Sequence, residues 1–270
     1  LYLVATPIGN LSEMTPRAIE ILNSVDIIAA EDTRNSIKLC QHFDIKTPLI
    51  AYHDFNEEKA SDKLIAALEE NKDIALISDA GYPLISDPGH DIVNKALEYG
   101  FNVVPISGSS AFINALVASG IVAHPFAFMG FLDSKASSLK KQLNEDKDLP
   151  LTLIYYVSVH KLEKSLKIMY DIFGNRQICL AREITKKHEE FIRGSILEVM
   201  QEVETLKGEF VLVIDKGEQE EKINLEDLVD TVQQLVQKGT KKSQAIAQIA
   251  KENKISKNEL YDAYHRRGRI

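Results

Sequence analysis

The chain has 270 residues, of which 44% are hydrophobic and 27% are charged. This composition is ordinary for a soluble globular protein and excludes a disordered chain, a collagen-like repeat and a disulfide scaffold. The apolar runs fall far short of the roughly 20 residues that a membrane helix needs, so we expect no membrane association. No secretion signal opens the sequence, and the two cysteines, Cys40 and Cys179, stand alone. We therefore expect reduced thiols, no metal site and a cytoplasmic protein.

Charge is distributed unevenly along the chain. The whole chain carries a formal charge of −8. Residues 238–270 hold nine Lys and Arg against three Asp and Glu, a net charge of +6, which leaves −14 for residues 1–237. An acidic body with a basic tail is typical of a contact with a polyanion or of a tethering surface. A solvated helix surface can have the same charge pattern. Charge alone does not distinguish a binding surface from a solvated one.

Short apolar runs alternate with helical patterns over the first 120 residues. The runs are continuously apolar and each is followed by a helix, which predicts a mostly parallel sheet covered on both faces. Thr15 and Pro16 suit the start of a helix, because Thr caps free N–H groups and Pro fits the first helical position. We expect strands at residues 2–5, 26–30, 49–51, 73–78 and 102–106, and helices at residues 15–23, 33–42, 57–71, 89–99 and 109–119.

A second α/β pattern and a helical tail follow. Strands are expected at residues 126–129, 151–157, 177–181 and 209–215, helices at 161–173 and 196–206, and a polar connection at 133–150. The acidic run 217–222 indicates a linker. The expected fold class is α/β, with two α/β domains, a ligand cleft between them and a small C-terminal helical extension. The domains are expected at residues 1–120, 121–217 and 218–270.

The extension is expected to be helical at residues 225–238, 243–252 and 257–266. Ser256 and Glu259 have the capping-box spacing that begins a helix. Two short basic helices joined by a tight turn resemble a helix-turn-helix. Tyr261 and Tyr264 are three residues apart, and we expect them to form a packing stripe rather than a base-stacking surface.

Four loops that follow predicted parallel strands are rich in Gly, Pro, Ser and Asp. They are residues 5–11, 30–34, 78–89 and 106–111. Ordinary turn chemistry explains any one of them, but the carboxyl ends of parallel strands share one edge, where ligands bind. The four together therefore predict a ligand site. The chain has no G-x-G-x-x-G after the first strand, no P-loop motif and no Cys/His ligand set. These absences argue against a dinucleotide dehydrogenase and a P-loop NTPase, and they give no indication of a zinc site.

The motifs T-P-I-G-N-L, A-E-D-T-R, S-D-A-G-x-P-x-I-S-D-P-G and A-R-E-x-T-K resemble those of the tetrapyrrole-methylase-like class of S-adenosylmethionine-dependent methyltransferases. The resemblance covers essentially the whole chain and is closest to the members that modify ribosomal RNA. It implies a two-domain homodimer with S-adenosylmethionine in the cleft. The implied reaction is 2′-O-methylation of a cytidine in the decoding region of 16S ribosomal RNA, in the small ribosomal subunit. Val157 departs from the family pattern Y-E-S-x-H-R, which has Glu there.

The same resemblance implies the site residues. Asp79 and Gly81 are the strongest, since a Gly-rich loop provides close backbone approach to a cofactor. The implied catalytic residues are Glu31, Asp32, Arg34, Glu183 and Lys186. The implied cofactor-binding residues are Pro7, Gly9, Asn10, Asp79, Ala80, Gly81, Ile85, Ser110, Ala111, Tyr156 and Ala181.

Positioning a ribose hydroxyl in line with the sulfonium methyl supplies on the order of 7–11 kcal/mol, and a nearby base adds about 10²–10⁴-fold. The candidate bases are Glu31, Asp32, His53, Glu183 and Lys186, and the candidate phosphate contacts are Arg34, Arg182 and Lys186. Each has a structural alternative: Asp32 with Arg34 orders a turn, His53 caps a helix, and Glu183 pairs with Lys186. Tyr155 and Tyr156 are adjacent on a strand, so one is expected to face the cleft and the other the core.

Two other functions remain open at this point. One is a methylase of a tetrapyrrole ring on the same fold, for which a basic tail has no use. The other is a non-catalytic module that holds nucleic acid through the C-terminal helices. This alternative stays open because Val157 stands where the family pattern has Glu.

Overall fold

The computed structural model describes residues 1–203, 206–217, 225–253 and 255–267. The chain forms two compact units, Leu1–Gly217 and Glu218–Ile270, which are described separately. The predicted acidic linker lies outside the described residues, except for Gly217. In the described ranges, no helix combines the length and the apolar character that crossing a membrane requires.

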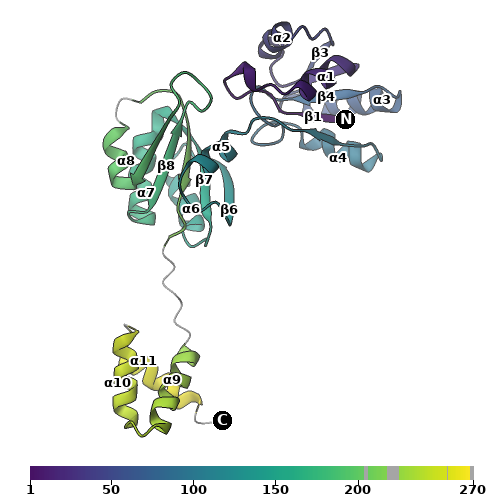
Figure 1. The fold of residues 1–270 in the computed structure, drawn as a ribbon. Helices are drawn as coiled ribbons and strands as arrows, with labels where there is room; N and C mark the ends of the chain where they lie inside the picture. The colour runs from purple at the N-terminus through teal and green to yellow at the C-terminus, as the bar shows by residue number, and fades with distance from the viewer. Residues whose placement is uncertain (204–205, 218–224, 254, 268–270) are drawn as a thin grey trace. The chain divides into compact units, whose positions relative to one another are not determined.

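The first unit begins with a five-stranded parallel sheet, as the continuous apolar runs predict (Figure 1). Because all five strands run the same way, the loops after them emerge at one edge. The strands, in spatial order, are β3 (Leu49–Ala51), β2 (Ile27–Ala30), β4 (Ile74–Ile77), β1 (Tyr2–Val4) and β5 (Val104–Ile106).

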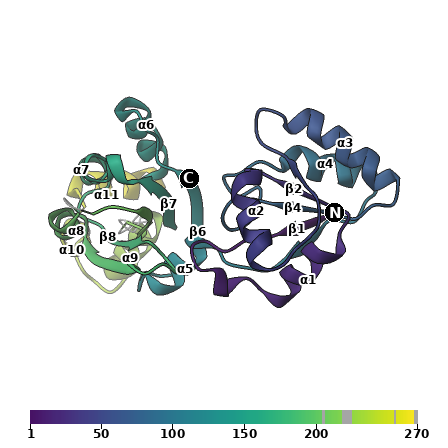
Figure 2. The ribbon, with the colours of Figure 1, turned by 90° about the horizontal axis from the view of Figure 1, so that it is seen from above.

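Helices cover both faces of this sheet (Figure 2). One face packs on α1 (Pro16–Ser24) and α2 (Thr33–His42), and the other on α3 (Glu57–Glu69) and α4 (His90–Glu98). Helix α1 begins as predicted: the Thr15 side chain accepts a hydrogen bond from the Ala18 N–H at 3.1 Å, and Pro16 occupies the first turn.

The second sheet is mixed. Its strands, in spatial order, are β6 (Phe126–Phe131), β7 (Thr152–Ser158), β10 (Glu209–Ile214), β8 (Gln177–Arg182) and β9 (Glu190–Ser195). Strands β6 and β7 are parallel, and the other pairs are antiparallel. One face packs on α6 (Ala136–Asp146), α7 (Leu162–Phe173) and α8 (Ile196–Glu202), and the other on α5 (Ala111–Ala118). The first unit thus contains two sheets with their helices, and we call the second sheet with α5 to α8 the second layer.

Two expectations for this layer are wrong. The polar connection at 133–150 contains helix α6, whose buried side chains Leu139 and Leu143 are spaced by one helical turn. Strand β9 is not among the expected strands, because its sequence E-F-I-R-G-S has no continuous apolar run; it pairs with β8. The domain boundary at residue 120 remains a proposal; helix α5 follows β5 of the first sheet but packs on the second.

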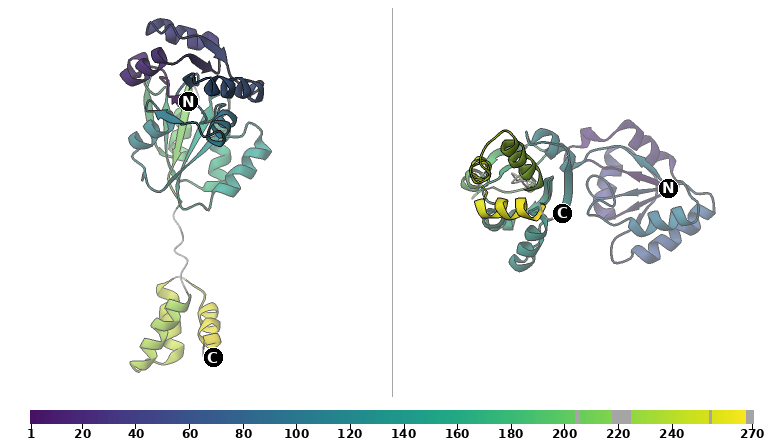
Figure 3. Two further views of the ribbon diagram at one scale, coloured as in Figure 1. Left: turned by 90° about the vertical axis from the view of Figure 1, so that its right-hand side faces the viewer. Right: turned by 90° about the horizontal axis from the view of Figure 1, so that it is seen from below.

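The second unit is a small bundle of α9 (Leu225–Gln237), α10 (Lys242–Glu252) and α11 (Lys257–Arg267), shown in Figure 3. Its core contains Val229 and Val232 of α9, Ile246 and Ile249 of α10, and Leu260 of α11. Because this core is made by residues of the unit alone, the bundle is stabilised by its own packing.

We predict that Tyr155→Phe destabilises the first unit. The Tyr155 side chain is fully buried, and its hydroxyl donates a 2.7 Å hydrogen bond to Oδ2 of the buried Asp146. Removing the hydroxyl leaves a buried carboxylate oxygen without its donor, which costs about 1–3 kcal/mol of unfolding free energy. Urea denaturation measures this loss. Tyr170→Phe, at a residue that is 37% exposed, is the control and is expected to change nothing.

Candidate active site

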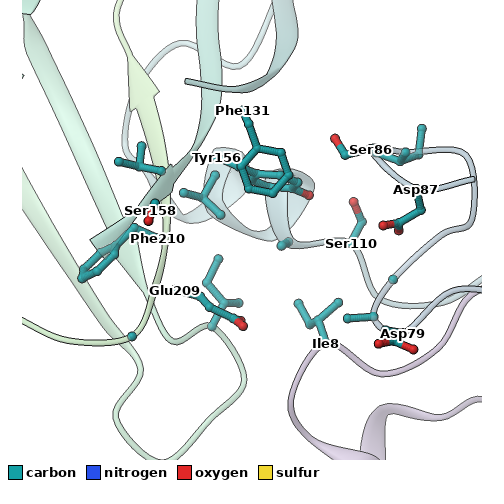
Figure 4. Close-up of a pocket in the computed structure, with 18 of the residues that line it drawn as sticks. Ile8, Asp79, Ser86, Asp87, Ser110, Phe131, Tyr156, Ser158, Glu209 and Phe210 are labelled. Atoms are coloured by element: carbon teal, nitrogen blue, oxygen red, sulfur yellow. The ribbon is translucent and has the colours of Figure 1, made fainter. Parts of the chain in front are cut away.

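A cavity of about 550 Å³ lies at the carboxyl edge of the parallel sheet and reaches the second sheet (Figure 4). This volume is within the range of small-molecule sites. The loops after β1, β2, β4 and β5 form one side, and β6, β7 and β10 form most of the other. The lining residues are Ile8, Glu31, Asp79, Ala80, Gly81, Tyr82, Ile85, Ser86, Asp87, Ser110, Ala111, Phe131, Tyr156, Val157, Ser158, Val159, His160, Ile184, Gly208, Glu209, Phe210 and Val211.

Backbone bonds hold the loops of the parallel sheet together. Thr6 and Gly81 exchange N–H···O bonds of 2.9 and 3.0 Å, which join the loop after β1 to the loop after β4. Gly81 has φ +81°, a conformation that suits glycine. Gly108, after β5, donates its N–H to the Tyr82 hydroxyl at 3.1 Å, and a Cβ there would approach Ala5 Cβ to 2.8 Å. Three loops are therefore fixed against one another at the cavity.

The cavity is acidic. Glu31, Asp79, Asp87 and Glu209 line it, whereas no Lys or Arg is among its lining residues in the described part of the chain. Glu31 accepts the N–H of Asp79 at 3.3 Å, and Asp79 accepts Nδ2 of Asn35 at 2.8 Å. Figure 4 shows Asp79 and Asp87 on the same side, with Glu209 across from them. Glu209 pairs with Lys186, which is not among the lining residues. Carboxylates that face a cavity with no cation in its lining favour a positively charged ligand.

Burial perturbs two of these carboxyls. It raises the pKa of Asp87 to about 7, and the negative charge of Glu31 adds to the shift. Burial also raises the pKa of Glu31, with the N–H of Asp79 acting in the opposite direction. A carboxyl that titrates near neutrality in a cavity is suited to accept and release a proton.

The opposite wall is aromatic. Tyr156 of β7 lines the cavity, with its ring centroid 5.2 Å from that of Phe131. Its neighbour Tyr155 points to the core, so the predicted division between the two tyrosines is confirmed. Val157 is 4% exposed and also lines the cavity, so the departure from the family pattern lies at the site. Burial raises the pKa of Tyr156 to about 12, which keeps its ring neutral.

Among the predicted catalytic residues near β2, only Glu31 lines the cavity. Asp32 caps helix α2 by accepting the N–H of Arg34 at 2.9 Å, and its carboxylate pairs with the Arg34 guanidinium at 2.6 Å. Hydrogen bonds from Arg34 hold the pKa of Asp32 near 2. Such a carboxylate is a weak base, so the turn-ordering alternative describes this pair.

Glu183 and Lys186 form a network beside the cavity. The Lys186 ammonium lies 3.1 Å from Glu183 Oε1 and 2.8 Å from Glu209 Oε2. Burial lowers the pKa of Lys186, but these carboxylates outweigh it and the net shift is upward, so Lys186 stays protonated and does not act as a base. Burial alone would raise the pKa of Glu183. The hydrogen bonds from the Glu209 N–H and from Lys186 outweigh burial, so the net shift is downward and Glu183 stays ionised. Glu183 and Thr185 both have positive φ, as strained functional loops often do.

The predicted cofactor-binding residues fall into three groups. Most line the large cavity. Pro7 and Gly9 line a neighbouring cavity of about 220 Å³ that shares Asp79, and a Cβ on Gly9 would meet Lys186 Cγ at 2.5 Å. Asn10 caps a short 3₁₀ helix (Leu11–Glu13), and Ala181 is buried in β8. The residues that line the large cavity are Asp79, Ala80, Gly81, Ile85, Ser110, Ala111 and Tyr156.

Sequence reasoning missed Asp87 and Glu209 as site residues. Asp87 belongs to the S-D-P-G end of the long loop, so a signal for it was present. Glu209 had no signal, since it reaches the site because β10 pairs with β7, where Glu209 lies opposite Ser158. His53, a candidate base, is not among the cavity-lining residues; its backbone N–H donates to Asn56 Oδ1 at 2.8 Å, at the start of α3.

The fold and site define a two-sheet α/β protein with an acidic ligand cavity at the carboxyl edge of its parallel sheet. Residues 1–200 match the family described as Tetrapyrrole (Corrin/Porphyrin) Methylases, and the chain belongs to this family. The resemblance of the four motifs is thereby confirmed. Methyltransferases of this type use S-adenosylmethionine as methyl donor.

Curated relatives align with nearly the whole chain. Proteins from Bacillus subtilis and from a Synechocystis species, each named "Ribosomal RNA small subunit methyltransferase I", are 46% and 44% identical to it. The alignments cover 98% and 97% of this chain, and 94% and 95% of those proteins.

Solved structures share the fold. A uroporphyrin-III-C-methyltransferase from Thermus thermophilus and the methyltransferase CobJ match with TM-scores of 0.54 and 0.56 at 19% and 17% identity. Each match covers 80% of this chain and 93% of the solved chain.

We predict that Asp87→Asn changes how stability depends on pH. Because the pKa of Asp87 is about 7 in the folded chain and near 3.9 when unfolded, the folded state holds a proton that the unfolded state has released. The unfolding free energy of the wild type therefore falls as pH rises from about 4 to about 7. The variant lacks this component.

Melting temperatures at pH 5 and pH 7.5 measure the difference. From pH 5 to pH 7.5, the melting temperature of the wild type is expected to fall further than that of Asp87→Asn. Asp133→Asn, at an exposed carboxyl, is the control and is expected to follow the wild type. Parallel behaviour of all three proteins would show that Asp87 is not the titrating group.

Proposed function

We propose that this protein methylates the 2′-hydroxyl of a cytidine in the decoding region of 16S ribosomal RNA, on the small ribosomal subunit. The observation that carries the proposal is the 43–46% identity, over nearly the full chain, to proteins named as ribosomal RNA small subunit methyltransferases. The identity includes the C-terminal unit, whereas the family match ends at residue 200. A ribosomal substrate also implies that the protein works in the cytoplasm.

The residues of the large cavity fit S-adenosylmethionine. Its sulfonium and ammonium are positive, and the carboxylates of Glu31, Asp79 and Asp87 supply the complementary charge. Apolar side chains such as Ile8, Ile85 and Val211 suit the adenine ring. Gly81 allows the backbone to approach the cofactor closely. When bound, the cofactor supplies an electrophilic methyl group.

The chain's own residues supply position and a proton acceptor. The Thr6–Gly81 bridge keeps the loops rigid, which favours alignment of the hydroxyl with the methyl group. We assign the role of base to Asp87, whose ionised carboxylate would take the proton of the 2′-hydroxyl. Asp87 suits this role better than the other lining carboxyls, because its pKa is about 7.

The other predicted catalytic residues take supporting roles in this proposal. Glu31 orients the Asp79 backbone, to which it is hydrogen-bonded. The loop of Glu183 and Lys186 holds Glu209 at the cavity wall. Arg34, whose side chain is 86% exposed, is available to contact a phosphate of the RNA.

We predict that the wild type transfers label from S-adenosylmethionine to undermethylated small ribosomal subunits. Nucleoside analysis is expected to show 2′-O-methylcytidine. Asp87→Asn is expected to lower kcat about 10²–10⁴-fold, because the base is lost, and Asp133→Asn is the matched control.

Three other results would contradict the proposal. Transfer to a tetrapyrrole but not to the subunit supports the alternative methylase. Binding of the cofactor with no transfer supports a non-catalytic module. Unchanged kcat in Asp87→Asn removes the role of Asp87 while leaving the methylation itself in place.

We also infer that the protein is a homodimer. Apolar side chains of α5 and the segment after it are exposed: Val117 is 72%, Val122 54% and Phe126 39% exposed. Phe126 begins β6, an edge strand of the second sheet. Exposed apolar side chains next to an unpaired strand edge suit self-association, in which a second copy presents the same surface.

We predict that Val117→Glu converts a dimer to a monomer. A charge placed at the centre of an apolar interface is desolvated without a partner, which weakens association by several kcal/mol. Light scattering coupled to gel filtration gives the mass of each variant. Leu97→Glu, on α4 at a residue that is 58% exposed, is the control and is expected to stay dimeric. A monomeric wild type would overturn the inference.

A further inference from the structure

The C-terminal unit carries a group of aromatic and cationic side chains outside its core. Tyr261 and His265 are one turn apart on α11, with ring centroids 4.4 Å apart at 50°. Lys242, the first residue of α10, places its Nζ 2.8 Å from His265 Nε2 and 4.7 Å from the centroid of Tyr264. We call Lys242, Tyr261, Tyr264 and His265 the α10–α11 cluster.

The two tyrosines differ in their surroundings. Tyr264 packs against the hydrophobic core of the unit, as expected of a packing stripe. Tyr261 is 47% exposed and is not part of that core, so the expectation is wrong for this residue. Its ring is held by His265 on one side and approached by Lys242 Nζ at 5.7 Å. Tyr261 is thus an ordered aromatic ring with a surface open to solvent.

The charge around the cluster is positive. Lys238 and Lys241 are exposed at the turn between α9 and α10, and Arg266 is exposed next to His265. Lys257 lies one turn before Tyr261 on the same face of α11. Glu259 and Asp262, the acids of this helix, are two and one positions from Tyr261 and so point away from it, and Asp262 lies one turn before Arg266. In contrast, the first turn of α9 contains Glu226 and Asp227.

We propose that the α10–α11 cluster binds single-stranded RNA, with a base stacked on Tyr261 and the neighbouring phosphates paired with Lys242, Lys241 and Lys257. Open aromatic rings flanked by cations are the chemistry that recognises unpaired nucleotides, because every base has a π-face and every linkage has a charge. The lining of the acidic cavity contains no Lys or Arg to pair with RNA phosphates. The basic surface of the C-terminal unit can form such pairs. The identification of RNA as partner rests on the proposed function.

Fluorescence anisotropy of the full-length protein with a short labelled single-stranded RNA tests this site. Tyr261→Ala is expected to weaken binding roughly ten-fold, whereas Tyr261→Phe, which keeps the ring, is expected to bind like the wild type. Tyr99→Ala, at a tyrosine of the first unit that is 60% exposed, is the matched control. Lys242→Gln is expected to lower the slope of log K against log salt by about one.

Kinetics with small ribosomal subunits separate this proposal from the function itself. Tyr261→Ala is expected to raise KM for the subunit and to leave kcat unchanged, since Tyr261 belongs to a different unit from the cavity. Equal RNA affinity and equal KM in Tyr261→Ala and the wild type would overturn the proposal while methylation stands. A wild type that binds RNA through Tyr261 but makes no 2′-O-methylcytidine would overturn the function and leave the cluster standing. If Tyr261→Ala loses helix content, Lys242→Gln serves as the test instead. A slope of log K against log salt equal to that of the wild type would then overturn the proposal.

Discussion

The site depends on the backbone bridge between Thr6 and Gly81. These two residues belong to loops 75 positions apart in the chain, and two hydrogen bonds of 2.9 and 3.0 Å hold them together. The bridge requires the positive φ of Gly81, which presents Asp79 and Ala80 to the cavity. It also fixes Gly9, whose missing Cβ leaves room for Lys186 of the second layer. The two layers therefore meet at Gly9 and Lys186, and also where helix α5 packs on the second sheet.

Electrostatics separate two tasks within one chain. The cavity gathers carboxylates, which suit a cationic cofactor but repel the phosphates of a nucleic acid. Residues 238–270 instead hold nine Lys and Arg against three Asp and Glu, and an exposed aromatic ring lies among them. A single net charge of −8 describes neither surface. In our proposals, the first surface holds the methyl donor and the second helps to hold the RNA.

The structural neighbours show how one fold serves different substrates. The uroporphyrin and CobJ methyltransferases share the two-sheet architecture at 17–19% identity and match 80% of this chain. The shared fold does not by itself define a substrate, because one fold can carry sites of different function. Helices α9 to α11 form a separate unit with its own core.

The amino-acid sequence by itself determined the parallel sheet, the four ligand loops and the division of Tyr155 from Tyr156. These features depend on local periodicity, on Gly and Pro in turns, and on the alternation of side chains along a strand. It did not determine how the Asp87 carboxyl titrates. Asp32 pairs with Arg34, two residues away, as the sequence suggests, and Arg34 holds its pKa near 2. Burial beside Glu31 raises the pKa of Asp87 to about 7, which no local pattern indicates. Only the tertiary structure decided this, because burial and distant neighbours control the pKa of a carboxyl. The same holds for Glu209, which β10 carries to the cavity, and for Tyr261, which packing on α10 leaves exposed beside Lys242.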